Sequence, residues 1–110
     1  MNSISVIELK ALIESDSSDV ALLDVRNPAE AEVATIPGAT LIPLAQIESG
    51  DALSQIRELA ADRRLLVHCK LGGCSARAVE LLAQKGIDAT NVRGGIDAWS
   101  QQVDPGVARY

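Results

Sequence analysis

Aromatic side chains are nearly absent from this sequence of 110 residues, which has one Trp, one Tyr and no Phe. A core without large rings has to be built from Leu, Ile, Val and Ala, which supply most of the 47% hydrophobic content. This mixture suits buried parallel strands that are covered by helices. The length allows one domain with a hydrophobic core and is too short for two.

Basic residues are also scarce, because ten Lys and Arg stand against fifteen Asp and Glu, for a formal net charge of −5. Nucleic acid is therefore excluded as a general partner, since phosphate binding needs a basic face, and an anionic substrate would need a local positive site. No apolar run approaches the roughly 20 residues of a membrane span, and residues 1–4 begin no signal peptide. We expect a soluble, cytoplasmic domain with no membrane partner.

Residues that bind metals are few as well, with two cysteines and one histidine. Two cysteines do not make the disulfide framework of a small secreted domain, and a reducing compartment would keep them as thiols. A zinc site with four protein ligands would need carboxylates to complete it. We assign the domain no metal and no cofactor.

Helix patterns and apolar strand patterns alternate along the chain. Capping boxes at Ser5 and Asn27 predict two helix starts, and continuous apolar runs predict buried strands over 20–25 and 65–68. The other predicted elements are short strands at 40–42 and 89–92 and helices at 51–61, from near Ser75 to Lys85, and from Ile96. This alternation predicts an α/β fold, a parallel sheet with helices on both faces, and residues 103–110 form an appendage.

A short glycine-bearing loop, Cys69–Ser75, joins the strand at 65–68 to the helix that follows. The loop places a thiol where backbone N–H groups converge at a helix N-terminus, and these groups favour an anion on the sulfur. Cys69 is therefore a candidate nucleophile. Asp24 also ends a strand, at the edge of the sheet where such folds bind ligands.

Three segments of the sequence together resemble a rhodanese-type sulfurtransferase domain. Leu23–Arg26 with Ile36–Ala39 is similar to the first signature of that family, the loop from Cys69 to its active-site loop, and Arg93–Trp99 to its closing signature. The segments occur in the expected order across nearly the whole chain. The resemblance implies one rhodanese-like domain over residues 1–110, with a five-stranded, mostly parallel sheet.

The resemblance also implies a thiosulfate sulfurtransferase-type enzyme. The Cys69 thiolate would take the outer sulfur of a donor such as thiosulfate, hold it as a persulfide and pass it to a nucleophilic acceptor. Lys70 and Arg77 are the local cations, which either hold the anionic end of the donor or lie in solvent. The implied substrate-binding residues are Lys70, Leu71, Gly72, Gly73, Cys74, Ser75 and Arg77.

A narrower similarity exists to the rhodanese domain that ends fused adenylyltransferase–sulfurtransferase proteins, which put sulfur on ubiquitin-like carriers. It rests on residues 4–10, 41–44 and 103–110, and it implies a ubiquitin-like sulfur-carrier protein or an adenylating domain as partner. Two positions depart from the family pattern. Thr35 stands where the family often has His, and Cys74 stands where it often has Arg, which removes a forked anion-binding donor.

Other functions remain open at this point. Cys69 is also compatible with a buried structural thiol, and the chain with a non-catalytic rhodanese-like module that binds a partner protein or senses redox state. Cys74 is either a small side chain turned toward the helix or a thiol that resolves a persulfide on Cys69. The related phosphatases use Cys-x5-Arg, but the sixth residue after Cys69 is Ser75 and the nearest arginine is Arg77. Phosphatase activity is therefore disfavoured.

Residues near the loop also have structural interpretations. Side chains alternate along a strand, so we expect His68 to lie on the opposite face from Cys69 and to be packed or hydrogen-bonded there. Asp24 and Arg26 are expected to form a structural ion pair or to brace the loop near the crevice, and contact with the substrate is the alternative. Trp99 is expected to anchor the core.

Overall fold

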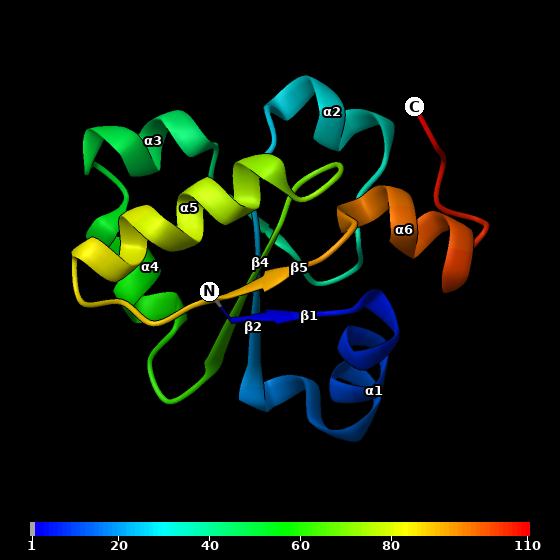
Figure 1. The fold of residues 1–110 in the computed structure, drawn as a ribbon, viewed down its shortest axis with the longest axis horizontal. Coiled ribbons are helices and arrows are strands. Elements are labelled where there is room, and N and C mark those ends of the chain that lie inside the picture. The colour runs from blue at the N-terminus through cyan, green and yellow to red at the C-terminus, as the bar shows by residue number, and fades with distance from the viewer. Residues whose placement is uncertain (1) are drawn as a thin grey trace.

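The computed structural model describes residues 2–110, so that Met1 lies outside it, and its strands form one sheet in the order β1-β5-β4-β2-β3 (Figure 1). The strands are β1 (Ser3–Ile4), β2 (Val20–Asp24), β3 (Thr40–Leu41), β4 (Arg64–His68) and β5 (Thr90–Val92). The helices are α1 (Val6–Asp16), α2 (Pro28–Val33), α3 (Leu44–Ser49), α4 (Leu53–Leu59), α5 (Gly73–Gln84) and α6 (Gly95–Gln102), with a 3-10 turn at Ser17–Asp19. Every neighbouring pair of strands is parallel.

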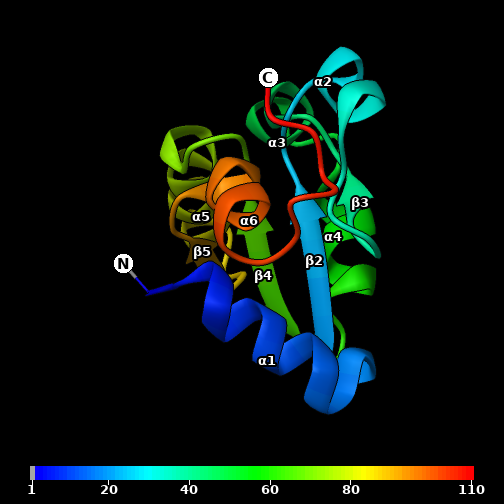
Figure 2. The same ribbon diagram turned by 90° about the vertical axis from the view of Figure 1, so that its right-hand side faces the viewer.

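Helices cover both faces of the sheet, as the sequence predicts (Figures 1 and 2). One core packs residues of α3, α4 and α5 against Val67 of β4, and the other packs residues of α1 and α6 against Leu66. Trp99 belongs to the second core and is buried, which confirms its predicted role. None of the helices within residues 2–110 is long and apolar enough to pass through a bilayer.

Both predicted capping boxes are present. The Ser5 hydroxyl accepts from the Glu8 backbone N–H at 3.1 Å, and the Glu8 carboxylate accepts from the Ser5 N–H at 3.2 Å. The same exchange joins Asn27 and Glu30 at 2.9 and 3.4 Å. The second box starts α2 directly after the end of β2, and it thereby fixes Glu30 near the carboxyl edge of the sheet.

Two short elements of the structure are not predicted by the sequence. The helix predicted over 51–61 is confirmed as α4 (Leu53–Leu59), but the sequence does not predict α3 (Leu44–Ser49), which precedes it and ends at Gly50 with φ of +86°. The strand β1 was not predicted. It is only two residues long, and it pairs with β5 through hydrogen bonds from Asn91 N to Asn2 O (3.0 Å) and from Arg93 N to Ile4 O (2.8 Å).

The segment 103–110 lies on the domain, although the sequence predicts an appendage. The Ser100 hydroxyl donates to the Val107 carbonyl, and Arg109 pairs with Asp97 of α6 at 3.0 Å. In both views the C-terminal end of the chain lies beside α2 (Figures 1 and 2). These contacts bring Tyr110 to the carboxyl edge of the sheet, where Cys69 lies.

Candidate active site

The Cys69 sulfur lies directly after β4, at the N-terminal end of α5. Its side chain is buried, and Sγ accepts a hydrogen bond from the Gly72 backbone N–H at 3.0 Å. Gly72 has φ of +119°, a conformation that favours glycine, and this turn brings its N–H back onto the sulfur. Because α5 begins at Gly73, the N–H groups of its first turn have no acceptor within the helix, so a negative charge on the sulfur is favoured here.

The start of α6 fixes the direction of the loop peptides. The Ile96 N–H donates to the Cys69 carbonyl at 2.9 Å, and the Asp97 N–H donates to the Lys70 carbonyl at 3.1 Å. In a trans peptide the N–H points away from the C=O, so the N–H groups of Lys70 and Leu71 point away from α6. The contact is close, because a Cβ atom on Gly95 would lie 2.3 Å from the Cys69 carbonyl oxygen.

A buried hydroxyl lies beneath the loop. Ser75 Oγ is 3.4 Å from Cys69 Sγ, 3.1 Å from the Gly72 carbonyl oxygen and 2.5 Å from Asn91 Oδ1. One hydroxyl proton thus has three acceptors in reach, and Ser75 can turn it toward the sulfur when the sulfur carries charge. Asn91 was not predicted as a site residue. The available signal was its polar side chain within the apolar strand pattern of 89–92.

A buried ion pair lies at the end of the neighbouring strand, as predicted. Arg26 donates to Asp24 through Nη2 at 2.7 Å and Nε at 3.0 Å, and both side chains are almost fully buried. Burial raises the pKa of the Asp24 carboxyl, but the hydrogen bonds from Arg26 outweigh it and hold the pKa below the usual value. Arg26 Nη2 also donates to the Ala34 carbonyl at 2.7 Å, which ties the chain after α2 to this pair.

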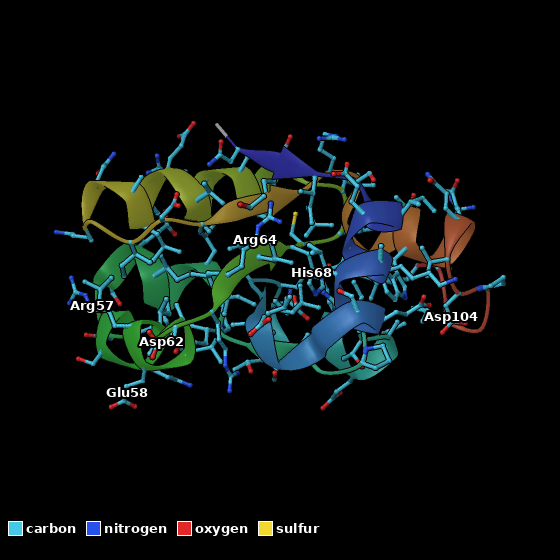
Figure 3. All side chains as sticks on the ribbon, turned by 90° about the horizontal axis from the view of Figure 1, so that it is seen from below. Arg57, Glu58, Asp62, Arg64, His68 and Asp104 are labelled. Carbon is cyan, nitrogen blue, oxygen red and sulfur yellow. The ribbon has the colours of Figure 1, made fainter. Side chains whose placement is uncertain are left out.

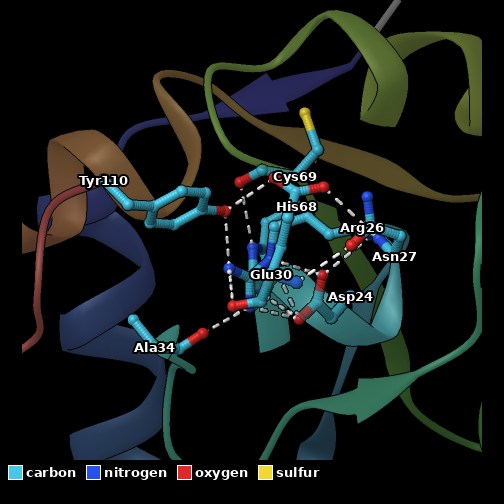
Figure 4. A network of polar contacts seen from close by, with 8 residues as sticks. All are labelled: Asp24, Arg26, Asn27, Glu30, Ala34, His68, Cys69 and Tyr110. Carbon is cyan, nitrogen blue, oxygen red and sulfur yellow. Dashed lines mark hydrogen bonds and ion pairs between the residues drawn. The ribbon is translucent and has the colours of Figure 1, made fainter. Parts of the chain in front are cut away.

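His68 is fully buried in the interior of the domain (Figure 3), and its ring contacts Asp24 and the Cys69 carbonyl rather than the sulfur, in agreement with the predicted alternation. Its Nδ1 donates to the Cys69 carbonyl at 3.2 Å, and its Nε2 is 4.0 Å from the Asp24 carboxylate. Figure 4 shows the Cys69 side chain pointing away from His68 and Asp24. Burial lowers the pKa of His68, and the nearby Asp24 charge offsets only part of this shift. The imidazole is therefore a neutral structural group at pH 7.

A pocket of about 270 Å³ opens at the sulfur. It is lined by Arg26, Glu30, Cys69, Lys70, Leu71, Gly73 and Cys74. The structure therefore brings five of the residues proposed from the sequence to one cavity, with Gly72 and Ser75 buried beside it. Arg77 is exposed on α5 and is not part of the lining. Within residues 2–110, no three His, Cys, Asp or Glu side chains gather to bind a metal ion.

Comparison with known proteins identifies the class to which this fold and site belong. The family model of the rhodanese-like domain matches residues 5–102, and the chain is a member of the rhodanese-like domain family. The crystal structure of SSP1007 from Staphylococcus saprophyticus superposes with a TM-score of 0.79 at 37% identity, over 99% of this chain and 100% of that one.

Within this family, the chain is similar to proteins that are named as sulfurtransferases. It is 38% identical over 104 residues to the probable adenylyltransferase/sulfurtransferase MoeZ of Mycobacterium tuberculosis, which covers 94% of this chain and 26% of that protein. It is 36% identical over 95 residues to a sulfurtransferase of Allochromatium vinosum, over 86% and 84% of the two chains. The chain spans 26% to 46% of the length of the first curated relatives that it matches. The narrower similarity to adenylyltransferase–sulfurtransferase proteins is confirmed.

The contact between Gly95 and the loop gives a stability prediction. We expect Gly95→Ala to lower the free energy of unfolding by about 3 kcal/mol or more, because the new Cβ meets a backbone carbonyl and φ is +57°. Gly38→Ala is the matched control, since Gly38 has φ of +86° and nothing within 4 Å of the added Cβ. The control should lose only about 1 kcal/mol. Equal losses in urea unfolding would show that the contact with the loop is unimportant.

The buried imidazole gives a pH prediction. Because the pKa of His68 lies below 6.5 in the folded chain, the unfolded chain binds more protons just below that pH. The free energy of unfolding should therefore fall as the pH drops below about 6.5, with a slope of at most about 1.4 kcal/mol per pH unit from this group. His68→Gln should flatten the slope between about pH 7.5 and 5.5 in urea titrations. Parallel curves for the two proteins would exclude His68 as the source.

Proposed function

We propose that this chain is a sulfurtransferase in which Cys69 carries the transferred sulfur as a persulfide. The observation that carries this proposal is the placement of one buried sulfur, which accepts the Gly72 N–H at 3.0 Å, at the N-terminal end of α5 and at the base of a pocket. Such a site stabilises a sulfur anion and admits a small molecule to it. The names of the relatives support a transferase of this family.

The reaction follows from attack by the thiolate. Cys69 Sγ, having lost its proton to solvent, attacks the outer sulfur of a donor such as thiosulfate, and the bond between the two donor sulfurs breaks as sulfite leaves with its electron pair. The new persulfide anion then lies among the N–H groups of the loop and the first turn of α5. A nucleophilic acceptor attacks the terminal sulfur, and Cys69 leaves as the thiolate. No net oxidation of the protein takes place.

The acceptor that we propose is a ubiquitin-like sulfur-carrier protein, presented by an adenylating domain. This proposal rests on the similarity to the MoeZ protein and to a relative named adenylyltransferase and sulfurtransferase MOCS3. Leu71 supports it physically, because it lines the pocket while the residue is 65% exposed. An apolar side chain at the rim offers a contact to a macromolecular acceptor. A reducing compartment such as the cytoplasm would keep Cys69 reactive.

Intact mass after thiosulfate treatment tests the assignment of Cys69. The wild-type chain should gain the mass of one sulfur atom, and Cys69→Ser should gain none, because the persulfide needs the thiolate. Cys74→Ser is the matched control, since it removes the second thiol of the same pocket, and it should still gain the sulfur. Sulfur on the Cys69→Ser variant, or none on the wild-type chain, would refute the proposal.

Cys74 gives a prediction on donor binding. Because Cys74 lines the pocket and is exposed, Cys74→Arg would place a forked cation there, where the family often has Arg. We expect its KM for thiosulfate to fall about fivefold with little change in kcat, since this contact already forms with the bound donor. Cys74→Met, which adds length without charge, should leave KM near the wild-type value. An unchanged KM in Cys74→Arg would exclude the missing arginine as a limit on donor binding.

A further inference from the structure

Tyr110 lies against two cations and one carboxylate that line the pocket at Cys69, namely Lys70, Arg26 and Glu30, and Figure 4 shows its contacts with the last two. Its hydroxyl accepts from Arg26 Nη1 at 2.7 Å and donates to Glu30 Oε2 at 2.8 Å. Its ring lies under the Lys70 ammonium, with Nζ 4.5 Å from the ring centroid. Three residues that line the pocket therefore meet on one side chain of the C-terminal segment.

Lys70 is the group most affected by this contact. Within residues 2–110 it makes no ion pair, and the Tyr110 ring is the partner of its ammonium. The carboxylate of Asp97 lies in the same narrow crevice, but it binds Arg109 at 3.0 Å and Gln101 at 2.9 Å. The positive charge of Lys70 is thus left available to a ligand.

The Arg26 cation is less available to a ligand in the pocket than the Lys70 cation. Arg26 is buried and holds Asp24, so its charge is already matched. Glu30, in contrast, brings a negative charge to the pocket lining, and that charge disfavours an anionic ligand. The Tyr110 hydroxyl binds this carboxylate and joins it to Arg26. Tyr110 thus contacts both the Lys70 cation, which attracts an anionic ligand, and the Glu30 carboxylate, which repels it.

We propose that Tyr110 is a positioning residue that holds Lys70 over the pocket as the binding group for the anionic part of the sulfur donor. That Lys70 binds a sulfur donor rests on the proposed function. The effect of its positive charge on the Cys69 sulfur does not. Both ends of Lys70 are fixed, because its carbonyl accepts from Asp97 N at 3.1 Å and its ammonium lies on the ring. Without the ring, the long side chain would spread over many rotamers, and its charge would spend less time at the pocket.

Steady-state kinetics with thiosulfate provide the first test. Tyr110→Leu removes the ring and should raise KM roughly two- to fivefold, the range expected for an exposed cation–π contact, with kcat nearly unchanged. Tyr110→Phe keeps the ring and should restore most of the loss. In a Lys70→Ala background, Tyr110→Leu should add nothing further. Full additivity of the two substitutions would overturn the proposal, because Tyr110 would then act independently of Lys70.

Alkylation of Cys69 provides a second test that needs no sulfur transfer. In a Cys74→Ser background, the rate ratio of iodoacetate to iodoacetamide reports the local charge at Cys69, since the two reagents are similar in shape and differ in charge. The ratio should fall roughly two- to fivefold in Tyr110→Leu and in Lys70→Ala, and it should stay near the starting value in Tyr110→Phe. An unchanged ratio in Tyr110→Leu would overturn the proposal. A wild-type chain that gains no sulfur would refute the proposed function and leave this measurement valid.

Discussion

The loop at Cys69 depends on one geometric constraint: a trans peptide directs its N–H and its C=O in opposite directions. The first turn of α6 binds the carbonyls of Cys69 and Lys70, so the peptides of the loop cannot turn those oxygens toward the sulfur. Gly95 permits the approach, and Gly72 reverses the chain so that its N–H reaches Sγ. The closing signature, Arg93–Trp99, thus acts on the Cys69 loop through backbone contacts, although none of its side chains lines the pocket at the sulfur.

Behind the loop, a layer of buried polar groups holds two strand ends in register. Asp24 of β2 lies opposite His68 of β4, and Arg26 binds the Asp24 carboxylate. His68 in turn donates to the same Cys69 carbonyl that α6 binds. Replacing one member would leave a buried polar group without its partner, which costs more than the net gain from a hydrogen bond. This layer therefore stabilises the scaffold on which the Cys69 loop lies.

The parts of this structure that depend on neighbouring residues could be predicted from the sequence. The capping boxes, the buried strands, the position of Cys69 and the opposite orientation of His68 all follow from spacings of a few residues. The helix α3 could not be predicted, because six residues carry too short a pattern. Contacts between distant segments also gave no local signal. Ser75 meets Asn91 across the sheet, and Arg26 meets Tyr110 across nearly the whole chain.

The strand β1 has a consequence for how the domain forms during synthesis. Its partner is β5, in which Asn91 pairs with Ser3. Almost the entire chain must therefore leave the ribosome before this edge of the sheet can form. Asn91 also contacts Ser75 beneath the sulfur, and α6 follows β5 directly. A nascent chain that already exposes Cys69 therefore still lacks the strand and helix that shape the loop around it. The groups that surround the Cys69 sulfur are therefore complete only after the C-terminal segments of the chain have packed onto the sheet.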